Sequence, residues 1–71
     1  MDVRQCLGEN LRRLRLEKGL GQEKFALEFA FDRTYISGTE RGVRNPTIVV
    51  VQKLADALGV PIFALLQEPA E

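Results

Sequence analysis

The chain has 71 residues with ten basic and ten acidic side chains, so its formal net charge is zero and its length allows one small apolar core. Apolar residues make up 45% of it, which excludes a disordered chain and leads us to expect a single domain over residues 1–71. The lone Cys6 excludes an internal disulfide, and without histidine it leaves no His or Cys metal centre; no long apolar run and no signal peptide are present, so we expect a cytoplasmic protein without a membrane span, metal or cofactor.

The first predicted helix runs from Val3 to Lys18, and Gly19 ends it. Arg12 and Arg13 lie among acidic residues on its polar side, where they are either solvated or in contact with a phosphate. Apolar residues recur at helical spacing along the other side: Val3, Leu7, Leu11 and Leu14.

The central stretch from Gln22 to Gly42 is predicted to form two short helices joined by a tight turn. The first helix spans Gln22 to Glu28 and the second spans Arg33 to Arg41. Ala30 and Phe31 turn the chain, and Asp32 is the expected N-cap of the second helix. The residues expected to face the core are Phe25, Ala26, Phe29, Ile36 and Thr39.

The C-terminal part is predicted to hold two more helices. Pro46 interrupts helical structure, and Thr47 then caps a helix over Ile48 to Ala57, although the β-branched run at its start also suits a strand. Gly59 is the expected stop. A short last helix spans Ile62 to Leu66 after Pro61, and residues 67–71 are expected to fray.

The run DRTYISGTERGVRN, preceded by a small and an apolar residue, resembles the helix-turn-helix of the phage repressor and Cro family. Within that family it is similar to the controller proteins of restriction-modification systems. The resemblance implies an all-α, lambda repressor-like domain, a compact five-helix bundle with a central helix-turn-helix over about residues 22–41. The chain also lacks the histidines, phosphate loop and paired carboxylates typical of enzymes, so we expect no catalytic residues.

The resemblance assigns DNA contacts to the second motif helix and its surroundings. The base-reading positions are Arg33, Thr34, Ser37 and Gly38. Arg33 can pair with guanine O6 and N7 in the major groove, whereas Gly38 either lets the backbone approach DNA or leaves one base pair poorly read. The expected phosphate contacts are Gln22, Tyr35, Arg41, Arg44 and Asn45. The alternative for each is a solvated side chain, or for Tyr35 packing on the scaffold.

Two further roles come from the same resemblance. In this family, the positions of Arg15 and Glu40 form a partly buried salt bridge between the first helix and the second motif helix, which is the family's recognition helix. Members of the family act as two-fold dimers, and the last helix is the candidate dimer surface. Its apolar residues either serve the dimer or simply close the core: Ile62, Phe63, Leu65 and Leu66.

The sequence therefore predicts a transcriptional regulator that reads double-stranded DNA. We expect a homodimer on a palindromic operator that regulates its own gene, of the controller-protein or phage or plasmid repressor type. Contact with RNA polymerase is compatible with this function, and we expect no interaction with a membrane. The alternative is an antitoxin-like protein that sequesters a partner protein.

Overall fold

The computed structural model describes residues 1–69 as five helices packed around one core. Their order is α1 (Val3–Glu17), α2 (Gln22–Glu28), α3 (Arg33–Glu40), α4 (Ile48–Leu58) and α5 (Phe63–Leu66). The predicted all-α fold is confirmed, and α2 and α3 form the helix-turn-helix. No helix in this part of the chain has the length and apolar character needed to cross a membrane.

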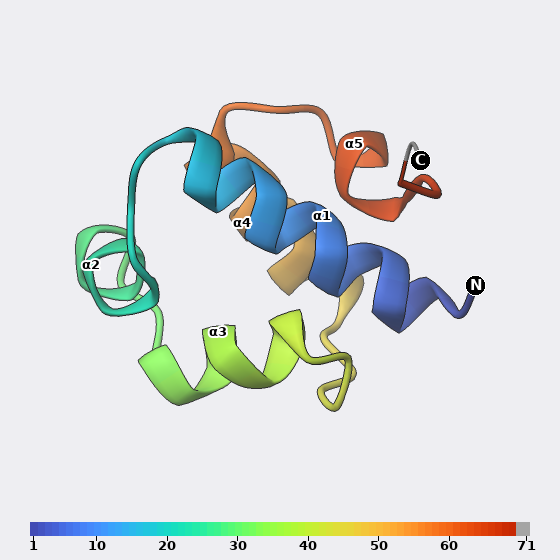
Figure 1. The fold of residues 1–71 in the computed structure, drawn as a ribbon, viewed down its shortest axis with the longest axis horizontal. Helices are drawn as coiled ribbons and strands as arrows, with labels where there is room; N and C mark the ends of the chain where they lie inside the picture. Colours follow the sequence, from blue (N-terminus) through green and yellow to red (C-terminus); the bar gives the residue numbers. More distant parts are fainter. Residues whose placement is uncertain (70–71) are drawn as a thin grey trace.

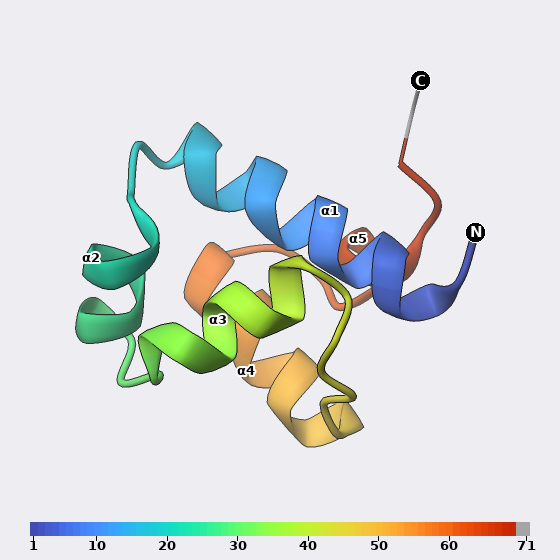
Figure 2. The same cartoon turned by 60° about the horizontal axis from the view of Figure 1, so that its bottom comes forward.

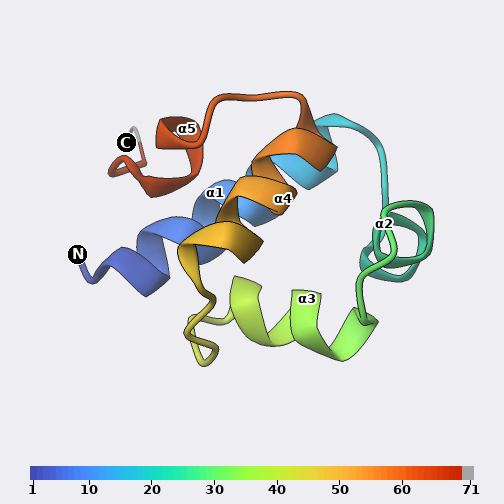
Figure 3. The ribbon, with the colours of Figure 1, turned by 180° about the vertical axis from the view of Figure 1, so that it is seen from behind.

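Helix α1 lies in the middle of the molecule. In Figure 1 it crosses the view with α5 above it and α3 below it, and α4 lies behind it. Figure 2 brings α3 to the front with no other helix in front of it, and Figure 3 shows α4 from the opposite side. Helices α3 and α5 therefore lie on different sides of α1.

The core is built from apolar residues of all five helices. Phe25 of α2 and Ile36 of α3 are fully buried in it, as the helical spacing predicts. Phe29 is only partly buried and packs on its edge. The buried members of the cluster are Leu7, Leu11, Phe25, Ala26, Ile36, Val51, Leu54, Ala55, Leu58 and Leu65.

The predicted capping residues are in place, and most helix ends lie within one residue of their predicted positions. The carboxylate of Asp32 accepts a hydrogen bond from the Thr34 N–H at 2.7 Å, and the Thr47 hydroxyl accepts from the Val50 N–H at 3.2 Å. Gly59 ends α4 with a φ of 71°, the left-handed conformation that glycine adopts readily. The β-branched start of α4 is therefore helical, because its cap and its buried face outweigh strand propensity.

The start of α1 differs from the prediction. Val3 is 57% exposed, so the apolar stripe begins at Leu7. The helix starts at Val3 because Asp2 caps it, and Asp2 and Gln5 form a reciprocal capping box. Hydrogen bonds from the Arg4 side chain and backbone hold the pKa of Asp2 below its usual value. This cap therefore stabilises the fold at neutral pH and is lost in acid, as the pH falls through that lowered pKa.

The tail prediction is wrong at its first residue. The carbonyl oxygen of Gln67 accepts a hydrogen bond from the Asn10 side-chain amide at 2.8 Å, so the chain stays attached to α1 beyond the end of α5. Residues 70 and 71 of the expected frayed tail lie outside the described residues.

The turn between α2 and α3 holds a strained residue. Ala30 has a φ of 61°, in the left-handed region, and the Phe31 N–H donates to the Ala26 carbonyl to close α2. A side chain with a Cβ costs about 1–2 kcal/mol in this conformation. Replacing Ala30 with glycine would remove part of that strain, because glycine adopts this conformation freely.

We expect Ala30→Gly to raise the free energy of unfolding by about 0.5–1 kcal/mol, since relief of the strain exceeds the added entropy of the unfolded chain. Urea denaturation measures the change. The matched control is Ala26→Gly, the same substitution inside α2, which should lower stability by about 1 kcal/mol or more. A loss of stability in Ala30→Gly would contradict the strain argument.

Candidate nucleic-acid interface

The outer side of α3 presents polar and basic side chains at helical spacing. Arg33 and Thr34 are exposed in the first turn, Ser37 is partly exposed one turn later, and Arg41 follows at the C-cap. The opposite side of α3 is buried through Ile36 and Thr39, whose hydroxyl donates to the Tyr35 carbonyl at 2.8 Å. The structure thus brings three predicted base-reading residues onto one free face.

The exposed charge of this region is positive although the chain is neutral. Within the described residues, the carboxylate of Glu40 is buried against Arg15, at 2.6 Å between Oε2 and Nε. Arg33, Arg41 and Arg44 are all exposed, and none of them takes part in an ion pair within residues 1–69. The only acidic side chain between Arg33 and Arg44 is therefore withdrawn from the surface, which leaves a basic face.

Gly38 lies beneath a neighbouring side chain. It is buried, and a Cβ built on it would lie 2.8 Å from Cγ and 3.1 Å from Nε of Arg44. The absence of a side chain thus makes room for Arg44, whose guanidinium carbon lies 5.4 Å from the centroid of the Tyr35 ring, a cation–π distance. The structure thus gives Gly38 a role that the sequence did not suggest, because the residue makes room for the Arg44 side chain.

We expect Gly38→Ala to stabilise the protein and weaken its binding to DNA. Alanine is favoured over glycine inside a helix by about 1 kcal/mol, but its methyl group would push Arg44 off Tyr35. Melting temperature and operator affinity should therefore move in opposite directions. In an Arg44→Ala background the same change should have little further effect on affinity, and an unchanged loss there would contradict the coupling.

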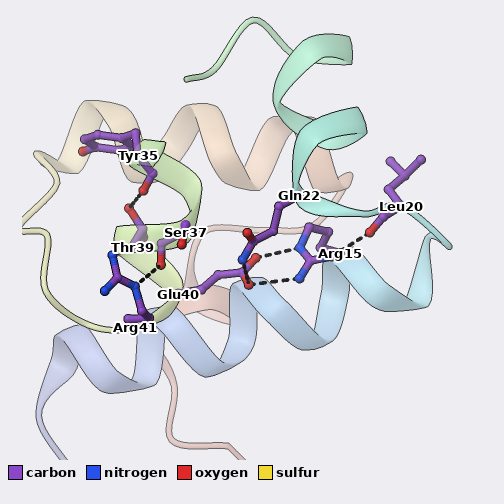
Figure 4. A network of polar contacts seen from close by, with 8 residues as sticks. All are labelled: Arg15, Leu20, Gln22, Tyr35, Ser37, Thr39, Glu40 and Arg41. Carbon is purple, nitrogen blue, oxygen red and sulfur yellow. Dashed lines mark hydrogen bonds and ion pairs between the residues drawn. The ribbon is translucent and has the colours of Figure 1, made fainter. Parts of the chain in front are cut away.

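Gln22 serves the interior of the motif more than its surface. Its side-chain amide donates to Oε1 of Glu40 at 3.0 Å. Arg15 donates to the same carboxylate through Nε and Nη2 and to the Leu20 carbonyl at 2.7 Å through Nη1. Figure 4 shows Arg15 and Gln22 converging on Glu40. The expected Arg15–Glu40 salt bridge is present and joins α1 to α3. The Gln22 side chain adds α2 by donating one of its amide hydrogens to the same carboxylate.

The remaining expected phosphate contacts lie at the C-terminal end of α3 and in the loop after it. Arg41 Nε donates to the Ser37 carbonyl at 3.4 Å, so part of its side chain folds back on the helix end. Asn45 is exposed in the loop, beside Pro46. Arg13, by contrast, pairs with Glu17 at 3.2 Å and contacts Asn10, on the side of α1 that carries α5.

The candidate dimer helix separates into inner and outer residues. Leu65 is 0% exposed and belongs to the core of the protomer, so its place in the dimer surface is wrong. Phe63 is 64% exposed, and Ile62 and Leu66 are partly buried against the core. Only the outer side of α5, centred on Phe63, is free to meet a partner.

Sequence reasoning missed two residues that position these elements. Asn10 is fully buried in α1 and binds two carbonyl oxygens near the end of α5. Gly8 lies so close to α3 that an added Cβ would be 2.5 Å from the Glu40 carbonyl oxygen. Asn10 gives no local signal of its role, because its partners lie 55 and 57 residues further along the chain. A glycine inside a helix is a signal, since it costs about 1 kcal/mol relative to alanine, but it does not say which helix packs against it.

Comparison with known proteins agrees with this geometry. The helix-turn-helix family HTH_3 matches residues 11–65. The uncharacterized HTH-type transcriptional regulator y4dJ of Sinorhizobium fredii is 50% identical over 60 residues, which cover 84% of this chain and 78% of that protein.

Solved structures of controller proteins are also similar. The restriction-modification controller protein C.AhdI from Aeromonas hydrophila is 44% identical, with a TM-score of 0.80 over 87% of this chain and 94% of that one. The controller protein C.Esp1396I, solved as a tetramer on its natural 35-base-pair operator, is 36% identical, with a TM-score of 0.81 over 93% and 91% of the two chains. The chain therefore belongs to the HTH_3 family of helix-turn-helix DNA-binding transcriptional regulators, close to the restriction-modification controller proteins.

Proposed function

We propose that the protein is a homodimeric, autoregulatory regulator that reads a palindromic operator in the bacterial cytoplasm. The observation behind the proposal is the outer side of α3 and of the loop after it, where Arg33, Arg41 and Arg44 are exposed while the Glu40 carboxylate is buried. A helix of this kind fits the major groove, and its first turn reaches base edges.

Arg33 is the proposed principal base-reading residue. It lies in the first turn of α3, it is exposed, and no carboxylate within residues 1–69 pairs with it. Its planar guanidinium can donate two parallel hydrogen bonds to a guanine. Thr34 and Ser37 supply shorter hydroxyl donors beside it.

Arg44, in the loop after α3, is proposed to make a second contact with the DNA. The Tyr35 ring and the space above Gly38 hold its side chain alongside α3, which lowers the entropy lost when it meets DNA. Arg41, Asn45 and the second amide hydrogen of Gln22 are proposed to bind phosphates, which fix the position of α3 without reading sequence.

The dimer is proposed to form through the outer side of α5. One eight-residue recognition helix reads few base pairs, so two copies related by a two-fold axis give the needed specificity. Phe63 is the large exposed apolar residue of α5, and aromatic residues are typical anchors of interfaces. The operator-bound C.Esp1396I assembly, a tetramer, supports self-association in a similar chain.

Selection of binding sites from random-sequence duplex DNA tests the proposal. We expect enrichment of a palindrome whose half-site centres are about 34 Å apart, one helical turn, bound by two protomers. Light scattering of the complex gives the stoichiometry. Enrichment of no sequence, or of a single unrepeated half-site, would contradict it.

A further inference from the structure

The α5 helix depends on α1 for its position. It has four residues, and its N-cap, Ile62, makes no side-chain hydrogen bond. A helix this short is not stable alone in water. Its carboxyl end is instead held from outside, since Asn10 Nδ2 donates to the Leu65 carbonyl at 2.9 Å and to the Gln67 carbonyl at 2.8 Å.

Asn10 is enclosed by the protein that it ties together. Its exposed fraction is 0%, so its side chain touches neither solvent nor a second molecule. Its remaining polar atom, Oδ1, accepts a hydrogen bond from Arg13 at 3.3 Å. Both polar groups of the side chain therefore have hydrogen-bond partners, and the amide holds the end of α5 against α1.

The same helix α1 also positions the recognition helix. Arg15 binds Glu40 at the end of α3, and Gly8 allows the backbone carbonyls of Thr39 and Glu40 to lie against α1. Figure 1 shows α5 and α3 on opposite sides of α1. Asn10 and Arg15 thus tie the proposed dimer helix and the recognition helix to one rigid element.

We propose that Asn10 is a positioning residue that sets the spacing of the two recognition helices in the dimer. This inference rests on the proposed dimer through α5. In a two-fold dimer, the distance between the α3 helices is determined by how α3 sits relative to α5, and α1 is the spacer between them. Loss of the Asn10 hydrogen bonds frees α5 to tilt, so the dimer loses its fixed half-site separation.

The test compares dimerisation and spacing preference in Asn10→Ala and wild type. Sedimentation should show a dimer dissociation constant raised by at least about tenfold, because the dimer must then hold α5 in place without the two buried hydrogen bonds of each protomer. Operators lengthened or shortened by one base pair move a half-site by about 3.4 Å along the axis and about 35° around it. Wild type should lose at least about tenfold in affinity on these operators, and the variant less than about threefold.

Phe29→Leu is the control for a merely structural effect. It removes packing on α2, at the end of the molecule away from α5. It should lower the melting temperature while leaving the dimer constant and the spacing preference unchanged. All measurements are made where circular dichroism shows every variant folded. Asn10→Ser, which keeps one donor, should be intermediate and replaces Asn10→Ala if the latter does not fold.

The outcomes separate this inference from the proposed function. A folded Asn10 variant with the wild-type dimer constant and the wild-type spacing preference would overturn the positioning role while leaving the dimeric regulator intact. Wild-type protein that binds DNA only as a monomer would overturn the dimer, and the role of Asn10 with it.

Discussion

Glu40→Ala is expected to lower the free energy of unfolding by about 3–5 kcal/mol, the usual cost of breaking a buried ion pair. The Glu40 carboxylate accepts from Arg15 and from Gln22, and the Arg15 and Glu40 side chains are both buried. Its removal leaves a buried guanidinium without its counter-charge. Urea denaturation followed by circular dichroism measures the loss.

Two variants show whether burial is the cause. Glu17→Ala breaks the exposed pair with Arg13 and should cost about 0–1 kcal/mol. Replacing both buried partners, as in Arg15→Met with Glu40→Leu, should restore much of the stability lost in Glu40→Ala, because no unpaired charge remains. Glu40→Ala that melts with wild type would show that the pair contributes nothing to the fold.

Arg33→Ala is expected to weaken binding to the operator by about 1–3 kcal/mol per half-site and to remove discrimination at the base pair that it reads. Its exposed position predicts a melting temperature close to that of wild type. Fluorescence anisotropy with the selected operator and with single-base variants measures both effects.

Arg12→Ala is the charge-matched control for Arg33→Ala. Arg12 is exposed on α1 near Pro69 and takes part in no ion pair within residues 1–69. Its removal should leave operator affinity nearly unchanged at physiological salt. Equal losses for the two variants would mean that Arg33 contributes only general charge and reads no base.

Local signals in the sequence predicted the helices well. Asp32, Thr47 and Gly59 cap α3 and α4 as expected, because a cap is a contact between near neighbours in the chain. Apolar spacing likewise identified the buried faces of α2 and α3. These features depend on periodicity and on residues a few positions apart, so one sequence is enough to find them.

Features set by tertiary packing were harder to predict. Val3 continues the apolar period of α1 but lies beyond the core, and Leu65 shares the character of its neighbours in α5 but points inward. The role of Gly38 depends on Arg44, whose side chain packs over Gly38 from the loop after α3. Asn10 lies 55 residues from its partner Leu65, and no local pattern links them.

The most direct test of the central claim, that α3 reads DNA sequence, is a footprint on the DNA upstream of the protein's own start codon at two salt concentrations. If α3 reads DNA sequence, wild type should give a symmetric protected site that persists at moderate salt, and Arg33→Ala should give none. Weak protection everywhere, equal for the two proteins and abolished by salt, would contradict it.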